Sequence, residues 1–141
     1  MANVASVNIG SWLGQYLIAA VVFCLLDLIW LGLVAKDLYR NVLGDLLAEK
    51  PNGKAAVLFY AIFIGGLVYF VTDPATTDGS WTTAVVGGAV YGFVTYATWD
   101  LTNLSVLENF PAKIVPIDMA WGTVLAASVS AATYHLWHLL T

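Results

Sequence analysis

Charged residues are scarce in this chain of 141 residues: they make up 10% of it, whereas hydrophobic residues make up 60%. A soluble globular domain carries about 25% charged residues, so the composition excludes that class and indicates a membrane protein. Only five residues are basic, against nine that are acidic, so we predict no basic surface for nucleic acid. Cys24 is the one cysteine, which excludes an intrachain disulfide.

Four apolar stretches are long enough to cross about 30 Å of hydrocarbon as helices: 12–35, 55–72, 82–104 and 114–139. They predict an all-α integral membrane bundle of four transmembrane helices, forming one transmembrane domain over residues 1–141. No basic residue precedes Lys36, so the first stretch lacks the positive segment of a secretory signal. We therefore expect it to be a retained helix.

The basic residues fall in the first and third connections between these stretches: Lys36, Arg40, Lys50, Lys54 and Lys113. The positive-inside rule places both connections in the cytoplasm, with loop 72–81 and the N- and C-termini outside. Segment 36–50 is predicted to be a short interfacial helix with one apolar face, formed by Leu38, Val42, Leu46 and Leu47. Ser80 is the predicted N-cap of the third span.

Two pairs of similar segments suggest a tandem helical-hairpin repeat. LLDLIWL (25–31) and TWDLTNL (98–104) both carry Asp-Leu near the cytoplasmic end of a span. VLGDLL (42–47) is then echoed by VLENF (106–110). A duplication of this kind is common in small membrane proteins.

Three aspartates, Asp27, Asp100 and Asp118, fall in apolar stretches, and the predicted topology puts all three in the cytoplasmic third of the bilayer. A charged side chain there costs about 2.5–3.5 kcal/mol, so we expect these acids to face one another or a polar cavity. Two ridges of small residues at four-residue spacing lead to Asp100 and Asp118 and predict close packing of the last two spans. The ridges are Ala84, Gly88 and Gly92, and Gly122, Ala126 and Ser130.

Other polar and aromatic residues near these acids complete the predicted site. Thr98, Thr102 and Asn103 sit at three- and four-residue intervals around Asp100, while Trp30 and Trp121 lie one turn from Asp27 and Asp118. This set predicts a site for a proton, a cation or a polar headgroup. The alternative is structural: interhelical hydrogen bonds hold the bundle together, and the tryptophans belong to an interfacial aromatic belt.

His135 and His138 share a helical face and are weak candidates for metal ligands; interfacial anchoring explains them better. Nothing in the sequence resembles a phosphate-binding loop, a zinc motif or a nucleophile with its base, so no catalytic residue is assigned. The sequence predicts no cofactor.

Six segments together resemble a family of small bacterial four-helix membrane proteins known as domain of unknown function 2177. They are DLIWLG (27–32), LYRNVLG (38–44), PN (51–52), FYAIFIGG (59–66), GGAVYGFVTYATWDLTN (87–103) and PIDMAWG (116–122). The resemblance implies a multi-pass protein of the bacterial inner membrane with membrane lipids as partners. Members of that family often occur beside genes for modified fatty-acid synthesis and for light or oxidative stress responses, which implies a lipid-related or stress-related setting.

Three classes of function remain open. The favoured hypothesis is a small proton- or cation-coupled carrier, homo-oligomeric or part of a larger membrane complex, that uses the three acids. The second is an intramembrane enzyme that modifies a lipid, with the carboxylates acting as acid and base or holding a divalent metal. The third is an accessory subunit in which the polar residues only fix helix packing.

Overall fold

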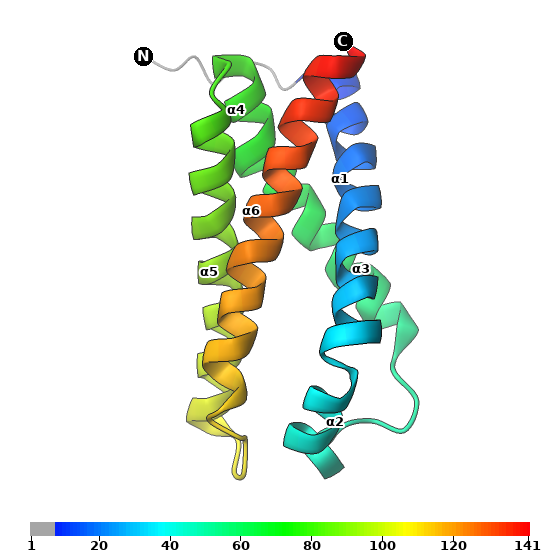
Figure 1. Cartoon of the computed structure of the whole chain (residues 1–141), viewed down its shortest axis with the longest axis vertical. Coiled ribbons are helices and arrows are strands. Elements are labelled where there is room, and N and C mark those ends of the chain that lie inside the picture. Colours follow the sequence, from blue (N-terminus) through cyan, green and yellow to red (C-terminus); the bar gives the residue numbers. More distant parts are fainter. Residues whose placement is uncertain (1–7) are drawn as a thin grey trace.

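The computed structural model describes residues 8–141, and all regular secondary structure in that range is helical. Four long helical segments run up and down the bundle in Figure 1. The first is α1 (Ile9–Ile29), which the π-helical segment η1 (Trp30–Val34) continues. The second is α3 (Gly53–Leu67), followed without a break by the π-helical η3 (Val68–Thr72) and by α4 (Asp73–Asp78).

The other two long segments are uninterrupted helices, α5 (Trp81–Val106) and α6 (Ile114–Leu140). A short helix, α2 (Lys36–Leu43), and the 3-10 turn η2 (Gly44–Leu46) connect the first long segment to the second. We call the end of the bundle that holds α2 and the α5–α6 connection the α2 end (Figure 1). The opposite end, with α4 and the last turn of α6, is the α4 end.

Three of these segments are long and apolar enough to cross a membrane, judged by length and composition: Ile9–Val34, Gly53–Asp78 and Ile114–Leu140. They correspond to the first, second and fourth predicted spans. α5, with 26 residues, is of similar length but is less apolar than the other long helices. The predicted span 82–104 is therefore a helix of sufficient length, and its place in the membrane stays a prediction.

The second long helix extends further than predicted, because the segment expected to be the loop 72–81 is helical as far as Asp78. Pro74 stands in the first turn of α4, directly after the π-helical η3, where its missing N–H is tolerated. The helix ends at Gly79, whose φ of 67° suits glycine. Ser80 then caps α5 as predicted: its Oγ accepts a hydrogen bond from the backbone N–H of Thr83 at 3.1 Å.

The predicted interfacial helix 36–50 exists but is shorter. α2 ends at Leu43, because the next residue, Gly44, has a positive φ of 49° that a helix cannot continue through. Of the predicted apolar face, Leu38 and Val42 pack against an apolar cluster at the start of α6, whereas Leu46 and Leu47 lie beyond the helix and are exposed. This packing docks α2 on the bundle.

The two predicted ridges of small residues do form the contact between α5 and α6. Ala84, Gly88 and Gly92 are the buried residues of α5 that precede Asp100. A Cβ atom on Gly88 would lie 2.6 Å from the carbonyl oxygen of Ala126, so the two backbones approach more closely than any side chain would allow.

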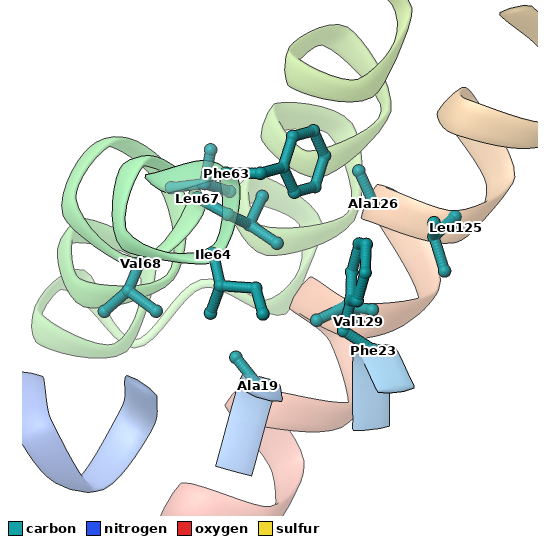
Figure 2. Close-up of a cluster of buried hydrophobic side chains, with 10 residues drawn as sticks. Ala19, Phe23, Phe63, Ile64, Leu67, Val68, Leu125, Ala126 and Val129 are labelled. Carbon is teal, nitrogen blue, oxygen red and sulfur yellow. The ribbon is translucent and has the colours of Figure 1, made fainter. Parts of the chain in front are cut away.

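The apolar core fills the middle of the bundle, where α1, α3 and α6 meet (Figure 2). Phe23, Leu67 and Leu125 are its largest fully buried side chains. The rings of Phe23 and Phe63 pack 5.5 Å apart, centroid to centroid. The middle third of the molecule is therefore closed by hydrocarbon side chains.

The predicted hairpin repeat is not confirmed. The first two long segments carry π-helical interruptions and are joined through α2, whereas α5 and α6 are continuous and are joined by a short connection. The two halves therefore differ in shape even though both place an aspartate near the α2 end.

Candidate functional site

The site at the α2 end begins with Asp27, which is 8% exposed. Asp27 closes a buried stripe of α1 with one residue per turn: Gln15, Ala19, Phe23 and Asp27. This spacing turns the carboxylate toward α3, where the hydroxyl of Tyr60 donates a hydrogen bond of 2.6 Å to Asp27 Oδ2. A hydrogen bond to a carboxylate is stronger than one between neutral groups, so Asp27 is held in place by a partner on another helix.

Asp118 is held by α2. The hydroxyl of Tyr39 donates a hydrogen bond of 2.7 Å to Asp118 Oδ1 and accepts one of 3.3 Å from the indole N–H of Trp30. α2 therefore carries Tyr39 into the bundle, where it connects the end of α1 to the start of α6.

Burial raises the pKa of Tyr39 above its usual value, and the hydrogen bond to Asp118 raises it further. Tyr39 lies on α2, outside the apolar segments. Its hydroxyl therefore remains a donor throughout the physiological pH range, and the acceptor in this pair is the carboxylate.

Trp30 and Trp121, predicted to flank the acids, are stacked on each other. Their ring centroids are 4.4 Å apart and their planes differ by 6°. The stack joins α6 to the first residue of η1, a π-helical segment of a kind often found at functional sites. Both rings line a cavity with Asp27 and Asp118.

Two cavities open at this end, with volumes of about 320 Å³ and about 200 Å³. Tyr39, Phe59, Tyr96 and Asp118 line both, so the cavities adjoin. We call them together the aromatic pocket. Its carboxylates and rings are Asp27, Trp30, Tyr39, Phe59, Tyr60, Tyr96, Trp99, Asp118 and Trp121.

The structure shows only part of the buried three-aspartate cluster that the sequence predicted. Asp27 and Asp100 are buried, and Asp118 forms part of the pocket wall with 9% of its surface exposed. Asp27 and Asp118 share a cavity, whereas Asp100 lines neither one. Asp100 is fully buried, and among residues 8–141 neither of its oxygens has a hydrogen-bond partner. It lies near enough to Asp118 for the two charges to interact.

The structure does not bring the two predicted threonines to the pocket. Thr98 and Thr102 are exposed, and the hydroxyl of Thr98 donates to the carbonyl of Val94 at 2.7 Å. The reason is helical geometry: a residue two positions from Asp100 lies on the opposite side of the helix. Asn103, three positions from Asp100, is half-buried on the same side.

The tyrosines are the site residues that the sequence reasoning missed. Tyr39 and Tyr60 supply both hydrogen bonds to the acids, and Tyr96 lines both cavities. A tyrosine in an apolar helix needs a partner for its hydroxyl, and this requirement was the available signal. The partners lie 33 and 79 positions away in the sequence, so the signal does not identify them.

The two histidines lie far from this pocket, near the end of α6. Each packs beside an aromatic ring: His135 beside Trp81, with centroids 5.8 Å apart, and His138 beside Tyr134 at 4.5 Å. In the described part of the chain, no group of three or more His, Cys, Asp or Glu residues is placed to hold a metal ion.

An all-helical bundle with three helices able to cross a membrane, and with buried carboxylates at one end, defines a helical membrane protein. The chain belongs to the family described as predicted membrane protein, domain of unknown function 2177 (DUF2177), whose sequence model matches residues 12–135. This match confirms the resemblance drawn from the six sequence segments. Neither the comparison with curated proteins nor the comparison with solved structures finds a match.

Proposed function

We propose that this protein is a small carrier in the bacterial inner membrane that binds an organic cation in the aromatic pocket. One observation carries the proposal: two carboxylates, Asp27 and Asp118, line a cavity whose other walls are largely aromatic. Carboxylates within apolar helices mark substrate and ion pathways. Aromatic faces attract cations, quaternary ammonium groups among them.

The shape and lining of the pocket favour an organic cation over a bare metal ion. A divalent ion such as Ca²⁺ takes about six to eight oxygen ligands, whereas this pocket offers two carboxylates and tyrosine hydroxyls among ring carbons. The larger cavity, at about 320 Å³, falls within the usual range of small-molecule pockets, which is about 300–1,000 Å³. The substrate we infer has one or two positive charges and a compact apolar body.

Asp100 is our candidate for the residue that carries the coupling proton. It is fully buried beside Asp118, and an ionised carboxylate without a partner is costly to bury. Movement of a proton onto or off Asp100 would change the charge next to Asp118, and so would change the affinity of the pocket for a cation.

The carrier as proposed has four spans, with α5 as the third. A helix of 26 residues is about 39 Å long, which is enough to cross the hydrocarbon core. All five basic residues lie in or next to the connections at the α2 end. The positive-inside rule then puts that end in the cytoplasm and both termini outside.

Binding is tested with a pair of probes of matched size and opposite charge, tetraphenylphosphonium and tetraphenylborate, by equilibrium dialysis of the purified protein. We expect the cation to bind, and Asp27→Asn or Asp118→Asn each to weaken binding about tenfold or more. Asp37→Asn is the matched control, because it removes the same charge from an exposed position on α2. Equal binding of the two probes, or unchanged cation binding in the double variant, would refute the site.

Transport is tested separately in proteoliposomes with radiolabelled tetraethylammonium, which crosses lipid poorly on its own. We expect uptake that depends on an imposed pH gradient, and Asp100→Asn to abolish this dependence while cation binding is retained. Uptake with an unaltered pH dependence in Asp100→Asn would remove the proposed proton role.

The four-span topology is tested by placing single cysteines at the two ends in a Cys24→Ser background. We expect Asp45→Cys to react with a membrane-impermeant thiol reagent only from the cytoplasm, and Thr77→Cys only from outside. Labelling of both from the same side would contradict the topology.

A further inference from the structure

A second group of buried polar side chains lies at the α4 end, away from the aromatic pocket. Its members come from α1, α6 and the η3–α4 segment, which contact one another. Four of the five are fully buried, and the fifth is a half-buried carboxylate. The residues are Gln15, Thr72, Asp73, Ser130 and Thr133, and we call them the α4-end cluster.

The cluster has unused hydrogen-bonding capacity. The side-chain amide N–H groups of Gln15 donate to Ser11 Oγ at 3.1 Å and to Asp73 Oδ1 at 3.0 Å. Among residues 8–141, no partner is found for Gln15 Oε1 or for the hydroxyls of Thr72, Ser130 and Thr133. Buried polar groups are nearly always paired, so four unpaired oxygens in one region point to a bound species.

Other threonines in the helices of this bundle do have a hydrogen-bond partner for their hydroxyl. Thr95 and Thr123 each donate to the carbonyl one turn earlier, at 2.8 Å. That local hydrogen bond is the usual way to satisfy a hydroxyl in an apolar helix. Thr72, Ser130 and Thr133 do not make it within the described chain, although they are more deeply buried.

Contacts between the helices place these oxygens at about the same level of the bundle. A Cβ atom on Gly88 would meet Ser130 Oγ, and one on the adjacent Gly87 would meet Val71, the neighbour of Thr72. Ser130 therefore lies level with Gly88, and Thr72 follows a residue that lies level with Gly87, so both are at about the same height along α5.

The remaining members lie within about one turn of that level. Gly14 lies against Trp137, which sets Gln15 about one turn from Thr133 across the α1–α6 contact. Gln15 is also tied directly to Asp73, the residue after Thr72. The oxygens thus come from three helical segments to one region.

We infer that the α4-end cluster binds one monovalent alkali cation, Na⁺ or K⁺. All its unpaired atoms are oxygens, the ligands that hard cations prefer. It holds a single carboxylate, Asp73, which balances one positive charge, whereas divalent ions are usually bound by several carboxylates. The amide and hydroxyl oxygens would complete the coordination.

The local backbone supports an ion site at this point. Thr72 is the last residue of η3, and π-helical turns are frequent at functional sites. Broken or irregular helices supply oxygens to the coupling ions of several transporter folds. This inference uses none of the residues of the aromatic pocket, so either proposal can fail while the other holds.

The test measures thermal unfolding of the purified protein at constant ionic strength in NaCl, KCl or N-methyl-D-glucamine chloride. A ligand that binds only the folded state raises the unfolding temperature. We expect a higher Tm, saturating with concentration, in NaCl or KCl than in the organic salt. The same difference must persist in the Asp27→Asn, Asp118→Asn double variant, in which the aromatic pocket lacks both charges.

Thr133→Val removes one proposed ligand with little change in shape. Its matched control is Thr123→Val on the same helix, where the hydroxyl is already paired with the carbonyl of Met119. We expect the difference in Tm between alkali salt and organic salt to fall by at least half in Thr133→Val and to be unchanged in Thr123→Val.

Direct binding of ²²Na⁺ and ⁸⁶Rb⁺ to the wild-type protein keeps the inference testable if Thr133→Val does not fold. We expect about one ion per chain for the preferred cation, and a loss of affinity of about tenfold in the second variant, Thr72→Val. No saturable binding of either ion, or an alkali-dependent Tm shift that is equal in Thr133→Val and Thr123→Val, would overturn it.

Discussion

Gly88→Ala tests whether the contact between α5 and α6 is as close as the structure has it. The added Cβ would lie 2.6 Å from the carbonyl oxygen of Ala126 and 2.6 Å from Ser130 Oγ, whereas ordinary contacts begin at 3.4 Å. The helices must separate by about 0.8 Å, and a gap of that size loses roughly a quarter to a half of the attraction of each contact along it.

The magnitude is best measured against a glycine that has room for a methyl group. At Gly65 of α3 the nearest atoms to a Cβ, on Tyr16 and Trp12, are 3.8 and 3.9 Å away, which is ordinary contact. Both substitutions gain the preference of alanine for the helix, about 0.5–1 kcal/mol, so that gain cancels in the comparison. The difference is the overpacking energy, and we expect Gly88→Ala to be less stable than Gly65→Ala by about 1–3 kcal/mol.

The assay is reversible unfolding of the purified protein in mixed micelles, followed by far-ultraviolet circular dichroism as the fraction of denaturing detergent rises. Equal stability of Gly88→Ala and Gly65→Ala would show that α5 and α6 are not in backbone contact at this point. The close packing of the two ridges would then be wrong.

Three further outcomes are expected. Tyr60→Phe leaves Asp27 without its 2.6 Å hydrogen bond and should lower the free energy of unfolding by about 1.5–3 kcal/mol, whereas Tyr69→Phe on the exposed surface should change it little; equal effects would contradict the contact. Tyr39 has a pKa raised above that of the unfolded chain, so its contribution to stability is complete below about pH 10 and is lost at higher pH; above about pH 10, stability should fall more steeply in the wild type than in Tyr39→Phe, and equal slopes would contradict the raised pKa. Cys24 faces outward from α1, so in lipid vesicles a water-soluble maleimide should label it slowly, and denaturing detergent should make it react fully; rapid labelling in vesicles would place it in water.

The acids and tryptophans of the pocket could be predicted from the sequence because they stand out there. Placing a carboxylate in an apolar membrane helix costs free energy, so such a residue draws attention. Asp27 and Asp118 are each followed three residues later by a tryptophan, and this shared spacing marks Trp30 and Trp121. The structure brings both acids and both tryptophans, Trp30 and Trp121, to one cavity. The same reasoning predicts a site residue at Asp100, but Asp100 is fully buried and lines neither cavity.

The rest of the site could not be read from local patterns. Tyr39 reaches Asp118 only because α2 docks against the start of α6, and this contact joins segments far apart in the chain. The threonines fail for a simpler reason: Thr98 and Thr102 are four residues apart from each other, but each is two positions from Asp100 and so leaves the helix on the other side. Thr98 is exposed and Asp100 is buried on opposite sides of α5.

Two buried stripes connect the aromatic pocket to the α4-end cluster and limit how a carrier of this shape can work. On α1 the stripe runs from Gln15 to Asp27, and on the antiparallel α6 it runs from Ser130 to Asp118. Each stripe is polar at both ends and apolar or small between them, and its ends are about 18 Å apart along the helix.

The side chains between the two polar ends, with Phe23 at their centre, are packed against α3 and leave no polar group on the α1 stripe to guide an ion (Figure 2). A cation or proton that crossed this protein would therefore need the packed core to open, because an unsolvated charge is not stable among hydrocarbon side chains. The π-helical η1 and η3 are where such a movement would most easily begin, since one adjoins the pocket and the other ends at the α4-end cluster. Because α1 and α6 each carry residues of both proposed sites, a movement of either helix at one end is the route by which the proposed carrier would couple the two ligands.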